Sequence, residues 1–333
     1  MLSSQLQEIK NDLNTYQKPH LSFEKQLENL RTNGLTVPNS SYALKKLSHI
    51  NYYRLSSYFL TFQYPKKSTK VNQFYTQSEF RHIIRLYDFD VKFRRLLFGA
   101  METIEVYVRT QIAYHHSAEH KAFGYLSNAS FQCNADVFEG LIEDIKKESK
   151  RSDEKFIQHF KDKYGTTDLP IWSVVEVLSF GTLSKIFYAM HNADKKLVIA
   201  QIPVTTTVFA KWLHSFTILR NICAHHSRAW NRELRVPFAI PSKNSMFDPL
   251  RKITKSKFKE EVDGKLIYKD KEYDNNNSIF FSLSVIKYIF DNIGEEVDFV
   301  TEIKQLLSSY PELDLKAMGF VDEWEKLDIW SDV

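Results

Sequence analysis

Apolar positions recur at helical spacing along most of the chain. From Ser78 to about His120 they indicate one long helix, because Phe80, Ile104, Val108 and the apolar residues between them form a continuous stripe. Shorter periodic segments predict helices over residues 22–33, 134–149, 153–164, 171–192, 205–225 and 278–308. A further helical pattern starts after Pro38, with Ser40 or Ser41 as its expected N-cap.

The segment "FKEEVDGKLIYKDKEYD" departs from this period. Its polar and apolar residues alternate around Asp263-Gly264, which is typical of a β-hairpin. The expected fold is therefore mainly α-helical with one small hairpin. The pattern predicts three parts: an N-terminal helical module (1–75), a helical bundle (76–235) and a C-terminal extension (236–333) that holds a basic crossing, the hairpin and a helical acidic tail.

Composition narrows the class of protein. Of the 333 residues, 43% are apolar and 14% aromatic, which is ample for a packed core. Cys133 and Cys223 lack any C-x-x-C partner, so neither a zinc site nor a disulfide framework is predicted and a reducing cytoplasm is expected. The N-terminus lacks the apolar run of a signal peptide, and the apolar run "SIFFSLSVIKYIF" is short and contains Lys287, so no membrane span is predicted.

Charge is distributed unevenly along the chain. Residues 220–257 contain nine basic and two acidic residues, a net charge of +7, whereas residues 294–333 contain three lysines and eleven acidic residues, a net charge of −8. This asymmetry suits a body that binds a polyanion and carries an acidic tail. A set of solvated helix faces explains the same charges, and charge alone does not decide between them.

The densest basic stretch begins with "RNICAHHSRAWNR", residues 220–232. Arg220 lies only about 40° around the preceding helix from Phe216, at the edge of its apolar stripe, where a guanidinium is costly to desolvate unless an anion meets it. His225 is rotated by about 140° from Arg220, so one straight helix does not aim both at one phosphate. Either the helix ends or bends between them, or a second copy of the helix completes the site across a two-fold axis.

Histidine and arginine together suit phosphodiester chemistry in RNA. An imidazole that titrates near neutral pH can take the proton of a ribose 2′-hydroxyl and return one to the leaving 5′-oxygen, while arginine stabilises the charged transition state. Asn221 is suited to orient the phosphate or the imidazole by hydrogen bonding. The expected products are a 2′,3′-cyclic phosphate and a 5′-hydroxyl, formed without a metal or other cofactor.

Several of these residues have a structural interpretation as well. His226, Arg228 and Arg232 are also typical cations of a helix C-terminus, and Trp230 is typical of a core. Glu102, Glu105 and Arg109 share one face of the long helix, either as a surface ladder of charge pairs or as a buried polar row beside an active site. The histidines of "AYHHSAEH" have no acidic or thiol partner at fixed spacing, so no metal site is predicted there.

The motif resembles the signature of the Abi-like abortive-infection family, the AbiD/AbiF group of anti-phage proteins within the HEPN ribonuclease superfamily. Arg220 and His225, with four residues between them, match its arginine–histidine motif. Four further segments match in the same order, over roughly residues 16–235: "YQKPHLSFEKQLENLRTNGL", "INYYRLSSYF", "LYDFDVKFRRLLFGAMETIEVYVRTQIAYH" and "LPIWSVVEVLSFGTLSKIF". The resemblance thins beyond about residue 240.

The resemblance implies a mainly α-helical HEPN bundle that forms a homodimer and cleaves RNA without metal at the shared site. Arg220 and His225 are then the catalytic pair and Asn221 a positioning residue, with Glu102, Glu105 and Arg109 as the supporting polar row. Some members of the group are toxins held in check by a structured non-coding RNA, which is therefore an expected partner beside the RNA substrate.

Two functions stay open at this point. The first is a toxin-like endoribonuclease of abortive infection. The second is an RNA-binding protein that grips a cognate structured RNA with little or no cleavage. For either function, the residues expected to contact RNA are His226, Arg228, Asn231, Arg232, Tyr52, Tyr53 and Arg54. A purely structural helical adaptor would leave Arg220 on its packing face unexplained.

Overall fold

The structure is a computed structural model that describes residues 19–295 and 298–331. It divides into two compact units. The first contains the described residues up to Asp88 together with Phe258–Tyr268, and the second contains Phe89–Lys257 and the described residues from Lys269 onward. The described chain is mainly helical with one two-stranded sheet, as the sequence pattern predicts. The division into 1–75, 76–235 and 236–333 stays a prediction.

Three short helices and the start of α5 form the helical part of the first unit. Their bounds are α2 Phe23–Thr32, α3 Ser40–His49 and α4 Tyr52–Phe59. Ser22 caps α2 by accepting a hydrogen bond from the Lys25 N–H. The cap predicted for α3 at Ser40 or Ser41 is wrong: Asn39 has the extended backbone of a cap, and its side chain accepts from the Tyr42 N–H at 2.9 Å.

The helical pattern that starts after Pro38 is interrupted in the structure. Ile50 has an extended backbone, and Asn51 then caps α4 by accepting from the Tyr53 N–H at 2.8 Å. Apolar spacing continues through the break because Leu47, Ile50 and Leu55 are all buried in the same core. Of the periodic residues, Leu47 and Ile50 are buried but Tyr42 and Tyr53 are exposed, so the apolar spacing identified only part of the buried face and missed the change of backbone.

The predicted hairpin is confirmed. Strands β1 Lys252–Val262 and β2 Lys265–Asp274 pair in one sheet, and the turn residues Asp263 and Gly264 both have positive φ, as a tight two-residue turn requires. The tip of the hairpin belongs to the first unit. There the Glu261 carboxylate accepts from the Ser68 hydroxyl and the Thr69 N–H, each at 2.8 Å.

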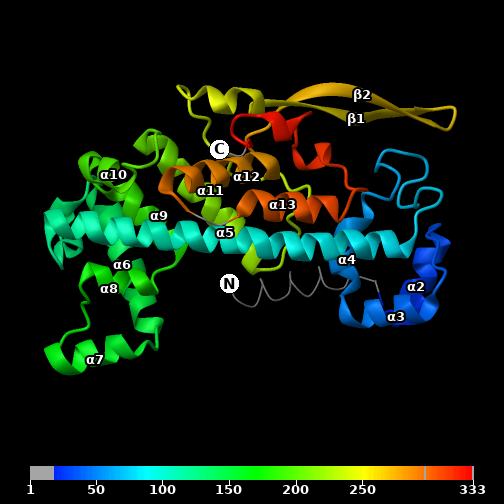
Figure 1. Ribbon diagram of the computed structural model, residues 1–333. Helices are drawn as coiled ribbons and strands as arrows, with labels where there is room; N and C mark the ends of the chain where they lie inside the picture. Colours follow the sequence, from blue (N-terminus) through cyan, green and yellow to red (C-terminus); the bar gives the residue numbers. More distant parts are fainter. Residues whose placement is uncertain (1–18, 296–297, 332–333) are drawn as a thin grey trace, which may run out of the picture. The chain divides into compact units, whose positions relative to one another are not determined.

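Helix α5, Phe80–His120, is the long helix that the apolar stripe predicts, and it runs unbroken through 41 residues (Figure 1). The remaining helices are α6 Ala135–Arg151, α7 Lys155–Tyr164, α8 Ile171–Val174, α9 Phe180–Ala189, α10 Asn192–Val198, α11 Thr206–Ala224, α12 Ile279–Ile293 and α13 Phe299–Ser308. Short 3₁₀ turns lie at Gly124–Leu126, Asn128–Ser130, Val175–Val177, Ser245–Leu250, Lys316–Met318 and Trp324–Lys326.

Helices α11 and α12 supply much of the core of the second unit. Phe209, Trp212 and Phe216 of α11 are buried, and α9 packs directly on this helix. Helix α12 is buried at every position from Ile279 to Phe290, so its apolar run is a core helix that is covered all round. No helix within the described ranges combines the length and the apolar character that crossing a bilayer requires.

Two predicted helices are each divided in the structure. The helix predicted over 171–192 breaks at Leu178, whose backbone is extended, and Ser179 caps the next segment. The Ser179 N–H donates to the Glu148 carboxylate of α6 at 2.7 Å, and this hydrogen bond stabilises the break. The helix predicted over 278–308 ends at Gly294, which has a left-handed backbone, and restarts at its new cap Asp298.

Candidate active site

The predicted motif lies at the C-terminus of α11, where the chain makes a tight left-handed turn. His225 is the C-cap, and His226 has φ 54°. The Ser227 N–H donates to the Ile222 carbonyl at 2.9 Å and the His226 N–H to the Cys223 carbonyl at 3.0 Å, the bond pattern of a Schellman motif. Because the helix ends at Ala224, the first of the two expected solutions, an end between Arg220 and His225, is present within one chain.

Arg220 is held in place without being buried. Its Nε lies 3.8 Å from an oxygen of Glu105, and its guanidinium lies 5.7 Å from the centroid of the Phe98 ring. The Arg220 side chain is 33% exposed, whereas that of Glu105 is 12% exposed. Glu105 of α5 therefore supplies the anion that Arg220 requires at the edge of the packing face. A third of the Arg220 side chain stays accessible to a ligand.

Glu105 also forms an ion pair with Arg109, one turn further along α5. The Arg109 guanidinium donates to the Val175 carbonyl at 2.6 Å and to the Leu178 carbonyl at 2.7 Å. These are carbonyls of the segment where the predicted 171–192 helix breaks, so Arg109 joins α5 to the chain at the break. Of the predicted polar row, Glu105 and Arg109 come together with Arg220, while Glu102 is exposed to solvent.

A buried ion pair, which the sequence analysis did not single out, fixes the chain just after the histidines. Asp90 pairs with Arg94 on α5, and the Asp90 carboxylate accepts from the Trp230 N–H at 2.6 Å and the Ala229 N–H at 3.1 Å. Both ionised side chains are nearly inaccessible to solvent. The sequence contains a signal for this pair. Asp90 lies on the apolar stripe of α5, and Arg94 lies on the same stripe four residues later.

The same pair acts on Cys223, which is buried below the motif. Burial first, and then the charge of Asp90, raises the pKa of the Cys223 thiol to about 12, and Arg94 lowers it only in part. The thiol is therefore protonated at neutral pH. Cys223 is a small packing residue of α11 and has none of the thiolate character that a nucleophile needs.

The comparisons with known proteins bear on this geometry. A family model described as Abi-like protein matches residues 45–231, more than half of the chain. The chain belongs to the Abi-like protein family. A search of curated proteins and a search of solved structures gave no match.

The match of the Abi-like family covers the elements that build the candidate site. It includes the whole of α5 and α11, the buried Asp90, and the motif up to Asn231. Helices α12 and α13 and the hairpin lie outside it. Membership of the Abi-like family suggests a role in abortive infection and is compatible with a nuclease-type enzyme.

The other predicted residues differ in their exposure. Asn221, His225, His226 and Arg232 are exposed, whereas Arg228 and Asn231 are half-buried, and Asn231 has φ 50°. Trp230 is fully buried, so it is a core residue of this Abi-like chain and its ring is closed to a nucleic-acid base. The tyrosines and the arginine of α4 belong to the first unit: Tyr52 packs on Phe59, Tyr53 is 86% exposed, and Arg54 is exposed.

The histidines at the end of α5 form a separate cluster. His120 Nε2 lies 2.9 Å from an oxygen of the buried Asp194, and the His116 and His120 ring centroids are 4.6 Å apart. His116 is completely buried, and neither of its ring nitrogens has a hydrogen-bond partner among the described residues. Within the same residues, no three His, Cys, Asp or Glu side chains converge as metal ligands.

Proposed function

We propose that this Abi-like protein is a metal-independent endoribonuclease of anti-phage abortive infection, with a HEPN-type active site. The observation that carries the proposal is the end of α11, where the oriented and partly exposed Arg220 precedes the exposed His225 at the helix end by one turn and a half. Both groups are fixed from α5, Arg220 by Glu105 and the chain beyond His225 by Asp90.

In the proposed reaction His225 takes the proton of a ribose 2′-hydroxyl, and the 2′-oxygen attacks the adjacent phosphorus. The bond from phosphorus to the 5′-oxygen breaks, and this oxygen receives a proton from the imidazolium. The products are a 2′,3′-cyclic phosphate and a 5′-hydroxyl. Arg220 stabilises the extra charge on the phosphate oxygens, and the exposed Asn221 orients the phosphate.

A homodimer completes the proposed site. Phe98, Val106 and Tyr114 are exposed apolar side chains of α5, and Phe98 is also the ring that Arg220 contacts. Exposed apolar side chains beside a site are typical of an interaction surface. A second copy that packs on α5 beside Phe98 would bring two α11 ends together, so that each histidine works with the arginine of either chain.

The proposal also includes the setting of the reaction. The cytoplasm supplies the RNA, and a structured non-coding RNA restrains the toxin until infection, as the resemblance to the AbiD/AbiF group implies. His226, Arg228, Asn231 and Arg232 would hold the RNA backbone next to the scissile phosphate, because they lie within residues 226–232, directly after the catalytic histidine.

Growth arrest and RNA decay on induced expression test the function. The wild-type chain is expected to arrest growth and degrade RNA, whereas His225→Ala and Arg220→Ala do neither while they keep the wild-type melting temperature and oligomeric state. His214→Ala, a change of another exposed histidine of α11 outside the motif, is the matched control and keeps full toxicity. Full toxicity of the Arg220→Ala/His225→Ala double variant would contradict the catalytic assignment.

The second candidate is an RNA-binding protein that grips a cognate RNA with little or no cleavage. Tyr53 favours it, because a ring that is 86% exposed beside Arg54 is suited to stack on an unpaired base. Co-purification of one discrete RNA with the His225→Ala variant, together with failure of the wild type to cut any RNA tested, selects this function. Loss of the bound RNA on cleavage by the wild type selects the ribonuclease.

A further inference from the structure

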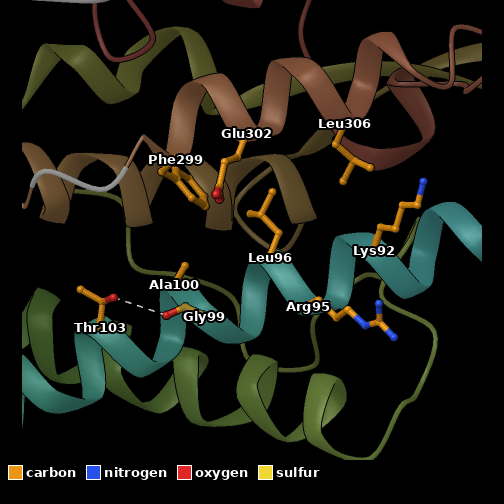
Figure 2. Close-up of a pocket in the computed structure, with 9 residues that line it drawn as sticks. All are labelled: Lys92, Arg95, Leu96, Gly99, Ala100, Thr103, Phe299, Glu302 and Leu306. Atoms are coloured by element: carbon orange, nitrogen blue, oxygen red, sulfur yellow. Dashed lines mark hydrogen bonds between the residues drawn. The ribbon is translucent and has the colours of Figure 1, made fainter.

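Helices α7 and α13 of the second unit are similar in length and in amphipathic character, but only α13 is covered. Each has ten residues, with its apolar side chains on one side of the helix. Phe299 and Ile303 of α13 are buried, and Figure 2 shows the Phe299 ring pointing toward α5. The structure describes all ten residues of α7, and none of them is buried. The apolar side of α7 is therefore uncovered within the described part of the chain.

The uncovered face of α7 consists of four side chains, three of which are aromatic. At about 100° per residue, one sector of about 100° around the helix contains Phe156, Ile157, Phe160 and Tyr164. Phe156 is 37% exposed and Tyr164 is 58% exposed, whereas Ile157 and Phe160 are half-buried. The Phe160 and Tyr164 rings pack on each other with their centroids 4.6 Å apart. Exposed apolar side chains that gather on one face are typical of a surface that binds a protein or a membrane.

The charged residues of α7 are ordered around this apolar face. Lys161 and Lys163 lie about 90° and about 70° from its centre, one on each border. Asp162 lies about 170° from the centre, in the middle of the opposite face, where its carboxylate accepts from the Gln158 amide at 2.6 Å. A helix of this pattern is suited to lie in the plane of an anionic surface. Both ammonium groups then reach the surface, while the carboxylate stays in water.

The chain just before α7 adds to the positive charge. Residues 146–163 contain seven basic and four acidic residues, a net charge of +3. One of the four acids, Glu148, is engaged by the N–H and the hydroxyl of Ser179. The last two turns of α6 carry four exposed cations, Lys146, Lys147, Lys150 and Arg151. In Figure 1, α7 lies at the lower edge of the second unit, beyond α6 and α8, so these charges gather away from the core of that unit.

A flat anionic membrane matches α7 more closely than a groove in a protein does. Lys161 and Lys163 border the apolar face at similar angles, so a flat surface meets both lysines at once, whereas a groove needs an acidic rim on each side. Tyr164 combines an apolar ring with a polar hydroxyl, and such rings are enriched where a membrane meets water. A helix of ten residues is marginally stable unless its apolar face is packed, and the acyl chains supply that packing.

We propose that α7 is an interfacial helix that binds the protein to a membrane surface of anionic lipid. The four apolar side chains of α7 enter the boundary between headgroups and acyl chains, and Lys161 and Lys163 contact the lipid phosphates. The helix lies on the bilayer, which agrees with the finding that no helix within the described ranges can cross one. The inference uses no residue of the candidate active site and does not depend on the proposed ribonuclease activity.

Sedimentation of the full chain with lipid vesicles tests the proposal. The protein is mixed with vesicles of equimolar phosphatidylglycerol and phosphatidylcholine, and separately with vesicles of phosphatidylcholine alone. We expect it to bind the anionic vesicles at least about tenfold more tightly, because several lysines face the headgroups. The amide hydrogens of residues 155–164 should exchange more slowly with the anionic vesicles than without them, because the helix is then covered.

The apolar face is tested by the double variant Phe156→Ala/Tyr164→Ala. Both side chains are exposed, so the variant should keep the wild-type melting temperature. Its binding to the anionic vesicles should be at least about tenfold weaker, because two aromatic rings no longer enter the membrane. Gln158→Ala, a change on the opposite face of α7, is the matched control and leaves vesicle binding unchanged.

The border charges are tested within the same helix. Lys161→Ala is expected to weaken binding to the anionic vesicles about fivefold, the contribution of one lysine near an anionic membrane surface. Lys155→Ala is the matched control, because Lys155 lies about 150° from the centre of the apolar face and points away from the membrane. Added salt should weaken binding of the wild type and should narrow the difference between the two variants.

Each of the other results overturns the inference. Equal binding to both kinds of vesicle, no binding to either, or binding that Phe156→Ala/Tyr164→Ala leaves intact removes α7 as a membrane helix. An oligomer that this variant dissociates, in a protein that binds no vesicles, assigns the apolar face to contact between copies of the chain. RNA binding that Lys161→Ala weakens, again without vesicle binding, assigns the lysines to RNA.

Discussion

Two ion pairs on α5 have the same spacing and differ in the groups that their carboxylates contact. Asp90–Arg94 and Glu105–Arg109 are both ion pairs four residues apart. The Asp90 and Arg94 side chains are 0% and 6% exposed, and the Asp90 carboxylate is used up by Arg94 and two backbone N–H groups. Glu105 instead shares its charge with Arg220, whose side chain is 33% exposed.

The difference teaches what each pair is suited to do. A closed pair whose hydrogen bonds are all made fixes the backbone, and nothing about it can change when a ligand arrives. An open pair orients a cation and still leaves that cation free to exchange a carboxylate for a phosphate. The same acid–arginine pair occurs twice on α5, fifteen residues apart. It provides a rigid anchor at Asp90 and an adjustable one at Glu105.

The largest effect that tests the comparison is expected at the closed pair. Asp90→Ala leaves Arg94 buried without its carboxylate and two N–H groups without an acceptor, so it should reduce the free energy of unfolding by about 3–5 kcal/mol. Asp90→Asn keeps an acceptor and should cost clearly less. Urea denaturation of the two variants measures both values. Equal stability of Asp90→Ala and wild type would show that the anchor is not structural.

His116, a third buried polar residue of α5, sharpens the comparison, because neither of its ring nitrogens has a hydrogen-bond partner in the part of the chain that the structure describes. Burial first, and then the neighbouring His120, lowers the pKa of His116 from 6.5 to about 4. The unfolded chain therefore binds more protons, and stability that is fully present above pH 6.5 is lost as the pH falls toward 4, by about 3 kcal/mol.

His116→Phe isolates this contribution. The variant replaces the ring by one that does not titrate, and it packs on the same neighbour, Phe131. Its free energy of unfolding should fall less than that of the wild type between about pH 7 and about pH 4. Parallel stability curves for the two proteins would contradict the assignment to His116.

The smallest effect on stability is expected at the open pair. Glu105→Gln removes the charge between Arg109 and Arg220 but keeps an acceptor, so the free energy of unfolding should fall by only about 1–2 kcal/mol. RNA cleavage should fall about tenfold or more, because Arg220 loses its orientation. Glu102→Gln, on the exposed neighbouring turn, is the control and should change neither quantity measurably. A Glu105→Gln protein that cleaves RNA like the wild type would remove Glu105 from the site.

The sequence pattern was most informative where structure is local. The stripe of α5 and the Asp263-Gly264 turn depend on residues that are neighbours along the chain, and both predictions are confirmed. The break at Leu178 depends on Glu148 and Arg109, which lie far from it in the sequence. Periodicity does not detect a break of this kind, since the flanking residues stay buried on the same face.

The candidate site divides in the same way. The motif residues themselves were visible as an arginine at the edge of a packing face and a histidine off its axis. The carboxylates that hold them were harder to assign, because Glu105 meets Arg220 and Asp90 meets Trp230 across more than a hundred residues. Asp90 was the more recoverable of the two, since it interrupts an apolar stripe in company with Arg94.

The most direct test of the central claim, that Arg220 and His225 cleave RNA by 2′-hydroxyl attack, is the chemistry of the cut ends. A labelled RNA is incubated with the wild-type protein in excess EDTA, beside the same RNA with 2′-deoxyribose at the cut position. The predicted result is 2′,3′-cyclic phosphate and 5′-hydroxyl ends, no cut at the deoxy position, and no cut by His225→Ala. Ends that carry a 5′-phosphate, or cleavage at the deoxy position, would contradict the account.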